Sequence, residues 1–146
     1  MPSVSHFMTR DPHTLAPTDT VAAAAQAMAK LNVGSIPVCD NGRLVGIVTD
    51  RDIVTRCVAR GHDPKSSQLS DAMSPTPRSA TESQDVDETL RAMAYMQIRR
   101  MPVVDASGKL VGIVSLGDIA SKDPKDASGV ARSLGAISAP APGAAK

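Results

Sequence analysis

The fold of this chain is decided by the stretch GIVTDRDI at residues 46–53, which returns as GIVSLGDI at residues 112–119. Each copy reads as a short apolar strand, then a hydroxyl residue, then an acid three positions later, where a helix should begin. Backbone N–H groups at a helix N-terminus attract anions, and an acid there can accept hydrogen bonds from ribose hydroxyls. The pattern therefore predicts a twofold repeat that holds an adenine nucleotide, with Thr49 and Asp52 in one copy and Ser115 and Asp118 in the other.

The repeat extends well beyond this motif. Matching positions share a shift of 65 residues: Met8 and Met73, Val21 and Val86, Met28 and Met93, Pro37 and Pro102, Asp40 and Asp105. One extra residue at 106–107 then changes the shift to 66, as from Gly46 to Gly112. A loop tip tolerates such an insertion best, so residues 106–107 are expected to form a turn.

Each repeat is predicted to contain a short strand, a long helix, a two-stranded hairpin and a second helix. In the first repeat the short strand is expected at 14–15, and Thr20 is expected to cap the long helix. Asn41-Gly42 predicts a tight turn between strands at 36–39 and 44–48. A helix over 50–60 should then end at Gly61. In the second repeat, Asp85 and Glu88 have the spacing of a capping box.

The composition limits the size of the domain, the side chains available to hold a base and the class of ligand. The chain has 146 residues, enough for one domain or two small units, and 42% of them are hydrophobic. Phe7 and Tyr95 are the aromatic residues, so a bound base would have to lie between aliphatic and proline side chains. A net charge of +1 argues against nucleic-acid binding.

The remaining signals indicate a cytoplasmic protein without a metal. Cys39 and Cys57 lack a CxxC spacing, which favours reduced, buried thiols. His6, His13 and His62 have no second ligand at metal spacing. The sequence shows neither a long apolar run nor the plan of a signal peptide, so no membrane association is expected.

The order of elements and motifs resembles the cystathionine β-synthase (CBS) domain, and two copies in tandem resemble a Bateman module. The stretch at 49–54 and the connector at 61–64 are similar to small stand-alone bacterial CBS-pair proteins, some of them associated with hypoxic or stress responses. The resemblance implies an α/β fold of two β-α-β-β-α repeats, related by a pseudo-two-fold axis with packed sheets. The expected organisation is an N-terminal arm (1–6), repeat 1 (7–61), a connector (62–71), repeat 2 (72–122) and an Ala/Pro-rich tail (123–146).

The resemblance also implies the binding residues. It assigns phosphate contacts to Thr49 and Ser115 and ribose contacts to Asp52 and Asp118. The expected cleft lining comes from the first strands, the Pro-Val strands and the motif strands: Thr14, Leu15, Ser35, Ile36, Pro37, Ile47, Ser79, Ala80, Arg100, Met101, Pro102 and Ile113.

The two clefts are not expected to be equivalent. Arg99 and Arg100 stand where repeat 1 has Gly34 and Ser35. A guanidinium can pair bidentately with phosphate, so the second cleft should prefer a charged nucleotide. A solvated basic pair at a strand start is the alternative.

Together these features favour a non-catalytic regulatory module for energy sensing, with no catalytic residue and no required cofactor. Its expected ligand is AMP, ADP, ATP or an S-adenosyl derivative, and its expected partners are a second copy, through stacked modules, and an unknown effector protein. One alternative is a structural or interaction homodimer without ligand, in which the hydroxyl and acid only cap helices. Another is a small nucleotide-handling enzyme, although no nucleophile–base pair or Walker loop is readable. The apolar positions that follow each motif form either core or dimer interface: Ile53, Val54, Cys57, Val58 and Ile119.

Overall fold

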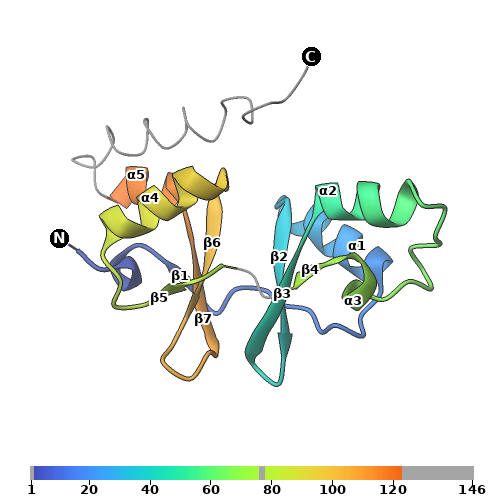
Figure 1. The fold of residues 1–146 in the computed structure, drawn as a ribbon, viewed down its shortest axis with the longest axis horizontal. Coiled ribbons are helices and arrows are strands. Elements are labelled where there is room, and N and C mark those ends of the chain that lie inside the picture. The colour runs from blue at the N-terminus through green and yellow to red at the C-terminus, as the bar shows by residue number, and fades with distance from the viewer. Residues whose placement is uncertain (1, 76–77, 123–146) are drawn as a thin grey trace, which may run out of the picture. The chain divides into compact units, whose positions relative to one another are not determined.

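The computed structural model describes residues 2–75 and 78–122, so the predicted tail over 123–146 lies outside the described residues. The chain has a mixed α/β fold with two sheets and forms two compact units (Figure 1). Unit 1 comprises the described parts of Met1–Arg10, Ser79–Asp105 and Val111–Lys146. Unit 2 comprises Asp11–Arg78, as far as described, and Ala106–Leu110. Neither unit is one continuous stretch of chain.

Unit 2 contains a sheet in the order β2-β3-β4, with helices packed on it. Its elements, in chain order, are α1 (Val21–Leu31), β2 (Ser35–Asp40), β3 (Arg43–Thr49), α2 (Asp50–Ile53), the π-helical η2 (Val54–Val58), α3 (Leu69–Ala72) and β4 (Ser74–Pro75). The strand expected at 14–15 is reduced to a parallel bridge between Leu15 and Val38.

Unit 1 contains the second sheet, in the order β1-β7-β6-β5. Its elements are η1 (Val4–His6), β1 (Thr9–Arg10), β5 (Ala80–Thr81), α4 (Val86–Met96), β6 (Arg100–Val104), β7 (Leu110–Ser115) and α5 (Leu116–Lys122). Ala80 pairs in parallel with Val103, which is the Leu15–Val38 bridge of the other unit shifted by 65 residues.

The two repeats exchange short strands. β1 comes from the first repeat but pairs antiparallel with β7 of the second, placing Thr9 opposite Ile113. β4 comes from the start of the second repeat but pairs antiparallel with β3 of the first, placing Ser74 opposite Ile47. The compact units therefore do not follow the boundaries expected from the repeat at 7–61 and 72–122.

Glycine at the start of each motif permits this exchange. A Cβ at Gly46 would lie 2.6 Å from the Met73 Sδ and 3.0 Å from the carbonyl oxygen of Ser74. A Cβ at Gly112 would lie 2.7 Å from the Met8 Sδ and 2.8 Å from the carbonyl oxygen of Thr9. Any side chain at these two positions would push the exchanged strand away.

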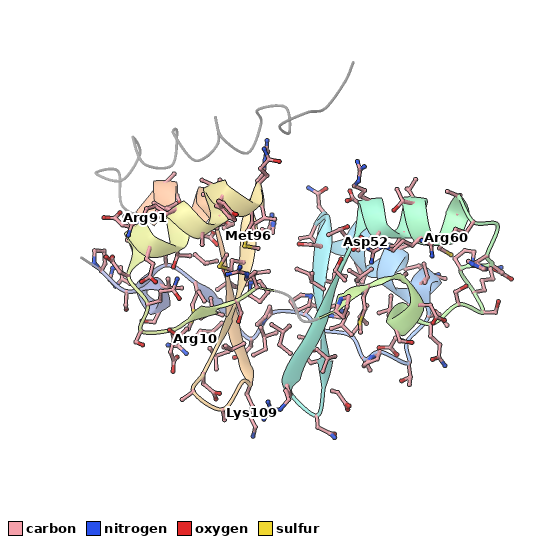
Figure 2. The ribbon with its side chains drawn as sticks, viewed as in Figure 1. Arg10, Asp52, Arg60, Arg91, Met96 and Lys109 are labelled. Carbon is pink, nitrogen blue, oxygen red and sulfur yellow. The ribbon has the colours of Figure 1, made fainter. Side chains whose placement is uncertain are left out.

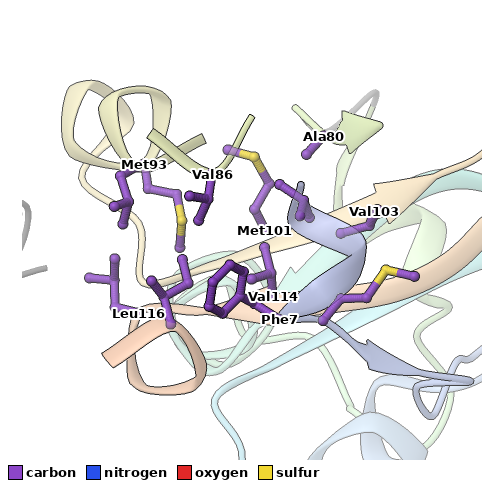
Figure 3. Packing of buried hydrophobic residues seen from close by; sticks show 12 residues of the cluster. Phe7, Ala80, Val86, Met93, Met101, Val103, Val114 and Leu116 are labelled. Atoms are coloured by element: carbon purple, nitrogen blue, oxygen red, sulfur yellow. The ribbon is translucent and has the colours of Figure 1, made fainter. Parts of the chain in front are cut away.

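Part of the N-terminal segment, including Val4 from the expected arm at 1–6, packs in the core of unit 1. Val4 and Phe7 are fully buried. Figure 3 shows the Phe7 ring among buried aliphatic side chains contributed by the second repeat: Ala80, Val86, Met93, Met101, Val103, Val114 and Leu116. The hydrophobic effect thus holds the first residues of the chain against residues far along the sequence.

Most local signals act as expected. The Thr20 side chain caps α1 by accepting from the Ala23 N–H at 3.1 Å. Asn41 and Gly42 both have positive φ, as the predicted hairpin turn requires. The Asp85 side chain accepts from the Asp87 N–H at 3.3 Å, so it caps α4 through a shorter loop than the predicted capping box.

Candidate functional site

The first motif forms a strand-to-helix junction in unit 2. The Thr49 Oγ1 accepts a hydrogen bond from the Asp52 N–H at 3.0 Å, and the Asp52 Oδ2 accepts one from the Thr49 N–H at 3.0 Å. This reciprocal capping box satisfies two backbone donors that the start of the helix would otherwise leave unpaired. The helix-capping interpretation of these two residues is therefore confirmed.

Capping leaves part of both side chains available. A carboxylate accepts through two oxygens, and a hydroxyl that accepts a hydrogen bond can still donate its proton. The Asp52 Oδ1 forms an ion pair with the Arg56 Nε at 3.9 Å, a separation too long for a hydrogen bond, and Asp52 as a whole is 8% exposed. The junction thus retains one carboxylate oxygen and one hydroxyl donor, the groups that ribose and phosphate require.

The second motif reproduces this geometry in unit 1. The Ser115 Oγ accepts from the Asp118 N–H at 3.0 Å, and the Asp118 Oδ2 accepts from the Ser115 N–H at 3.3 Å. The backbone around the two junctions also matches. The Asp50 N–H donates to the Gly34 carbonyl at 3.0 Å, and the Leu116 N–H donates to the Arg99 carbonyl at 3.0 Å. The same side-chain and backbone arrangement has formed twice.

Neighbouring strand residues divide between two faces of the unit 2 sheet. Ser35 lies opposite Thr49 in the β2–β3 pairing, and Pro37 lies opposite Ile47. Because side chains alternate along a strand, these four residues share one face. Ile36 points the other way into the helix-covered core and is 1% exposed, so its side chain does not line a site next to Thr49.

The first-strand residues of unit 2 border a separate hollow. Thr14 and Leu15 line a cavity of about 310 Å³ that includes neither Thr49 nor Asp52. Cys39 lines the same cavity, and burial raises the pKa of its thiol.

Some of the residues expected to line the second cleft are buried in the core, and others are accessible. The Ala80 and Met101 side chains are buried in the core cluster of unit 1, and Pro102 is buried as well. Ser79 and Arg100 are exposed, and Ile113 is half-buried. Of the predicted lining side chains in unit 1, these three remain accessible to a ligand.

The two junctions differ in charge by more than the sequence pattern indicated. Asp50 begins the first helix with an exposed carboxylate, 3.4 Å from where a Gly34 Cβ would lie. The equivalent Leu116 is 3% exposed and packs in the core. Arg99 stands in place of Gly34. The first junction therefore carries the extra negative charge of Asp50, and the second carries the extra positive charge of Arg99.

A second cavity of unit 2, which sequence reasoning missed, has a volume of about 320 Å³. Its lining combines apolar residues with polar and charged ones: Val21, Arg56, Cys57, Arg60, His62, Ser67, Asp71 and Ala72. The available signal was the pair Arg56 and Arg60, which are four residues apart. Within residues 2–75 and 78–122, no three His, Cys, Asp or Glu side chains gather closely enough to hold a metal ion.

Some of the apolar residues that follow the motifs are core residues, and others are exposed. Ile53, Cys57 and Ile119 are core residues, whereas Val54 and Val58 are 58% and 60% exposed. None of the helices over the described residues has both the length and the apolar character needed to span a bilayer.

A known protein family has the same repeated architecture. The CBS domain model matches the chain twice, over residues 4–59 and 69–125. The chain therefore belongs to the CBS-domain family and carries a tandem pair, as its sequence predicted. It is 42% identical over 120 residues to the CBS domain-containing protein YhcV of Bacillus subtilis, which covers 82% of this chain and 84% of YhcV.

Solved structures of other CBS proteins share the fold. Hypoxic Response Protein I, solved with two coordinated zinc ions, has a TM-score of 0.78 at 33% identity, covering 84% of this chain and 100% of that one. CBSX2 in complex with AMP has a TM-score of 0.74 at 28% identity, covering 86% and 98%. The CBS domain pair of MJ0100, in complex with 5′-methylthioadenosine and S-adenosyl-L-methionine, has a TM-score of 0.73 at 29% identity, covering 83% and 98%.

Proposed function

We propose that this protein is a non-catalytic regulatory module that binds adenosine-containing ligands at its two strand-to-helix junctions. Thr49 and Ser115 would donate to phosphate or an equivalent group, and Asp52 and Asp118 would accept from the ribose hydroxyls. Two of the similar structures were solved with AMP or with adenosyl compounds, which supports this class of ligand.

The observation that carries the proposal is the repeated capping geometry. Each junction commits one carboxylate oxygen and the acceptor side of one hydroxyl to the helix. Each therefore holds its carboxylate and its hydroxyl oxygen in position before a ligand arrives, while the hydroxyl proton can turn toward an acceptor, and such preorganisation lowers the cost of binding.

A thermal-shift panel of AMP, ADP, ATP, S-adenosylmethionine and NAD tests the proposal. A ligand that binds only the folded state must raise the melting temperature. Asp52→Asn and Asp118→Asn should each lower the affinity of one site by about tenfold or more, because a charged acceptor is lost. No shift with any member of the panel would instead favour the ligand-free interaction protein.

Capping and ligand binding can be separated at Ser115. Asp is as good an N-cap residue as Ser, so Ser115→Asp should keep the helix stable. Its negative charge should repel a phosphate, so AMP binding at this junction should be lost while the melting temperature of the free protein changes little. A variant that keeps its AMP affinity would show that Ser115 has only a structural role.

The charge difference leads us to rank the two junctions. The Ser115–Asp118 junction, with Arg99 and Arg100, is proposed as the better site for a phosphorylated nucleotide. Arg100→Ala should weaken AMP or ATP binding in isothermal titration by about tenfold. Unchanged affinity would remove the ranking but leave the proposed ligand class intact.

Regulation requires a partner that responds to the ligand. We propose that the module works as a homodimer and passes ligand occupancy to an effector protein. Any such response is limited by the difference in ligand affinity between the two conformations involved.

A further inference from the structure

The cavity around Arg60 is lined by neither Thr49 nor Asp52, although its Arg56 also forms an ion pair with Asp52 at 3.9 Å. Figure 2 shows Asp52 near the start of the helical stretch formed by α2 and η2, and Arg60 beyond its other end. Arg60, His62 and Asp71 all line this cavity and are exposed. In the part of the chain that the structure describes, their side chains form no hydrogen bond or ion pair. Arg60 and Asp71 thus remain unpaired although they border the same space.

The other arginine of the cavity is held in place. The Arg56 Nη1 donates to the carbonyl oxygens of Ala72 at 3.3 Å and Met73 at 3.0 Å. These bonds fix one edge of the guanidinium and leave its second terminal nitrogen without a hydrogen bond to the described residues. A fixed arginine loses little side-chain entropy when it contacts a ligand.

The backbone also shapes this wall of the cavity. η2 is a π-helix, in which the Ala59 N–H donates to the Val54 carbonyl at 2.8 Å. The His62 N–H donates to the Cys57 carbonyl at 3.0 Å, and Gly61 between them has a positive φ of 75°. Segments of π-helix occur frequently at functional sites; this one contains Arg56, and the turn that follows it carries Arg60 and His62, which line the same cavity.

We infer that this cavity binds phosphate, or a phosphate group that keeps a proton at neutral pH. Arg56 and Arg60 match the planar, multidentate contacts that guanidinium makes with phosphate oxygens, and His62 adds a further donor. Asp71 would repel a fully ionised anion but can accept a hydrogen bond from a protonated phosphate oxygen. Sulfate has the same shape and no such proton at pH 7. The cavity should therefore discriminate between these two anions. At about 320 Å³ it also has room for a small organic group attached to the phosphate.

Isothermal titration of the full chain with inorganic phosphate, and separately with sulfate at matched ionic strength and pH 7, tests this inference. The wild type should bind phosphate at least about tenfold more tightly than sulfate. Arg60→Gln should weaken phosphate binding by about tenfold, and Asp71→Asn should remove most of the preference over sulfate. Both positions are exposed, so the melting temperature of each free variant should stay close to that of the wild type.

Arg91→Gln is the matched control, because it removes an exposed arginine from α4 and leaves the cavity intact (Figure 2). Its phosphate affinity should equal that of the wild type. Amide shifts on phosphate addition should concentrate at residues 56–72. Absence of phosphate binding, equal binding of sulfate by the wild type, or unchanged binding in Arg60→Gln would each overturn the inference. Phosphate binding that is unchanged in Arg60→Gln but lost in Ser115→Asp would belong to a strand-to-helix junction, so this inference and the adenosyl-ligand proposal can fail separately.

Discussion

At the scale of single residues, the repeated motif has an observed structural role and a proposed ligand-binding role, which use different atoms of the same side chains. The hydroxyl and the acid of each motif stabilise the start of a helix, and capping by such residues contributes about 1 kcal/mol. Because capping uses only part of their hydrogen-bonding capacity, the loss of stability in a variant does not measure ligand binding by the same side chains. The paired changes Ser115→Asp and Asp118→Asn separate the two roles.

Glycine at the start of each motif gives a prediction about packing. Gly112→Ala should destabilise the fold by about 1–3 kcal/mol, because its Cβ would lie 2.8 Å from the backbone oxygen of Thr9, which cannot move without disturbing β1. Urea denaturation measures this loss. Gly46→Ala should cost somewhat less, since its nearest backbone oxygen, that of Ser74, is 3.0 Å away.

Gly117→Ala is the control for this pair of variants. The nearest atom to its Cβ is the Ser115 Oγ at 3.8 Å, an ordinary contact, and the residue lies in helix α5. It should be neutral or stabilising by up to about 1 kcal/mol. If Gly112→Ala proved as stable as Gly117→Ala, close strand approach would not be the reason for the glycine.

The Cys39 thiol gives a prediction about pH. Burial raises its pKa in the folded protein, so the unfolded chain loses this proton first as the pH rises. The contribution of this group to stability is complete below the pKa of an unfolded cysteine, about 8.5, and is lost as the pH rises toward the folded pKa. Urea denaturation at pH 7.5 and 9.5 should show a smaller loss of stability for Cys39→Ser than for the wild type. An equal loss in both proteins would contradict this assignment.

At the scale of elements, the exchanged strands make the N-terminus part of a distant core. Phe7 is fully buried among residues from the second repeat, whereas the adjacent His6 is exposed. Phe7→Ala should therefore cost about 3–5 kcal/mol, with amide shift changes concentrated at residues 79–122. His6→Ala should change stability by less than about 0.5 kcal/mol. Changes concentrated at residues 11–75 instead would contradict the strand exchange.

At the scale of the whole molecule, the exposed apolar face of η2 bears on assembly. Val54 and Val58 are four residues apart and are both more than half exposed, which is unusual for large apolar side chains on one helical turn. If they form the proposed dimer interface, Val58→Asp should convert the protein to a monomer in sedimentation velocity. The melting temperature of that monomer would report the stability of the isolated chain.

Thr55→Asp is the matched control for that experiment, because Thr55 is exposed on the same helical stretch and is polar already. It should leave the oligomeric state unchanged. A wild type that sediments as a monomer would exclude this interface, and the adenosyl-ligand proposal would then apply to a single chain.

Local patterns in the sequence were enough to predict the two long helices, the two hairpins, the helix after each motif and the Thr20 cap, but not η1 or α3. Thr20, Asn41 and Gly61 act through their own backbone and nearest neighbours, so their effects can be predicted without the rest of the fold. The Pro-Val and motif strands were also predictable, since their apolar residues alternate or run together. The tandem repeat identified the family for the same reason, because it is a pattern within the chain itself.

What the sequence by itself determined is thus the two long helices, the two hairpins, the helix after each motif, their order and the repeated hydroxyl–acid pair. Only the tertiary structure decided which repeat each short strand joins, which predicted lining residues turn into the core, and that Arg56, Arg60 and Asp71 border one cavity. Strand partners and cavity walls depend on contacts between residues far apart in the chain. Two-residue strands such as β1 and β4 are also too short to carry a periodic pattern of their own.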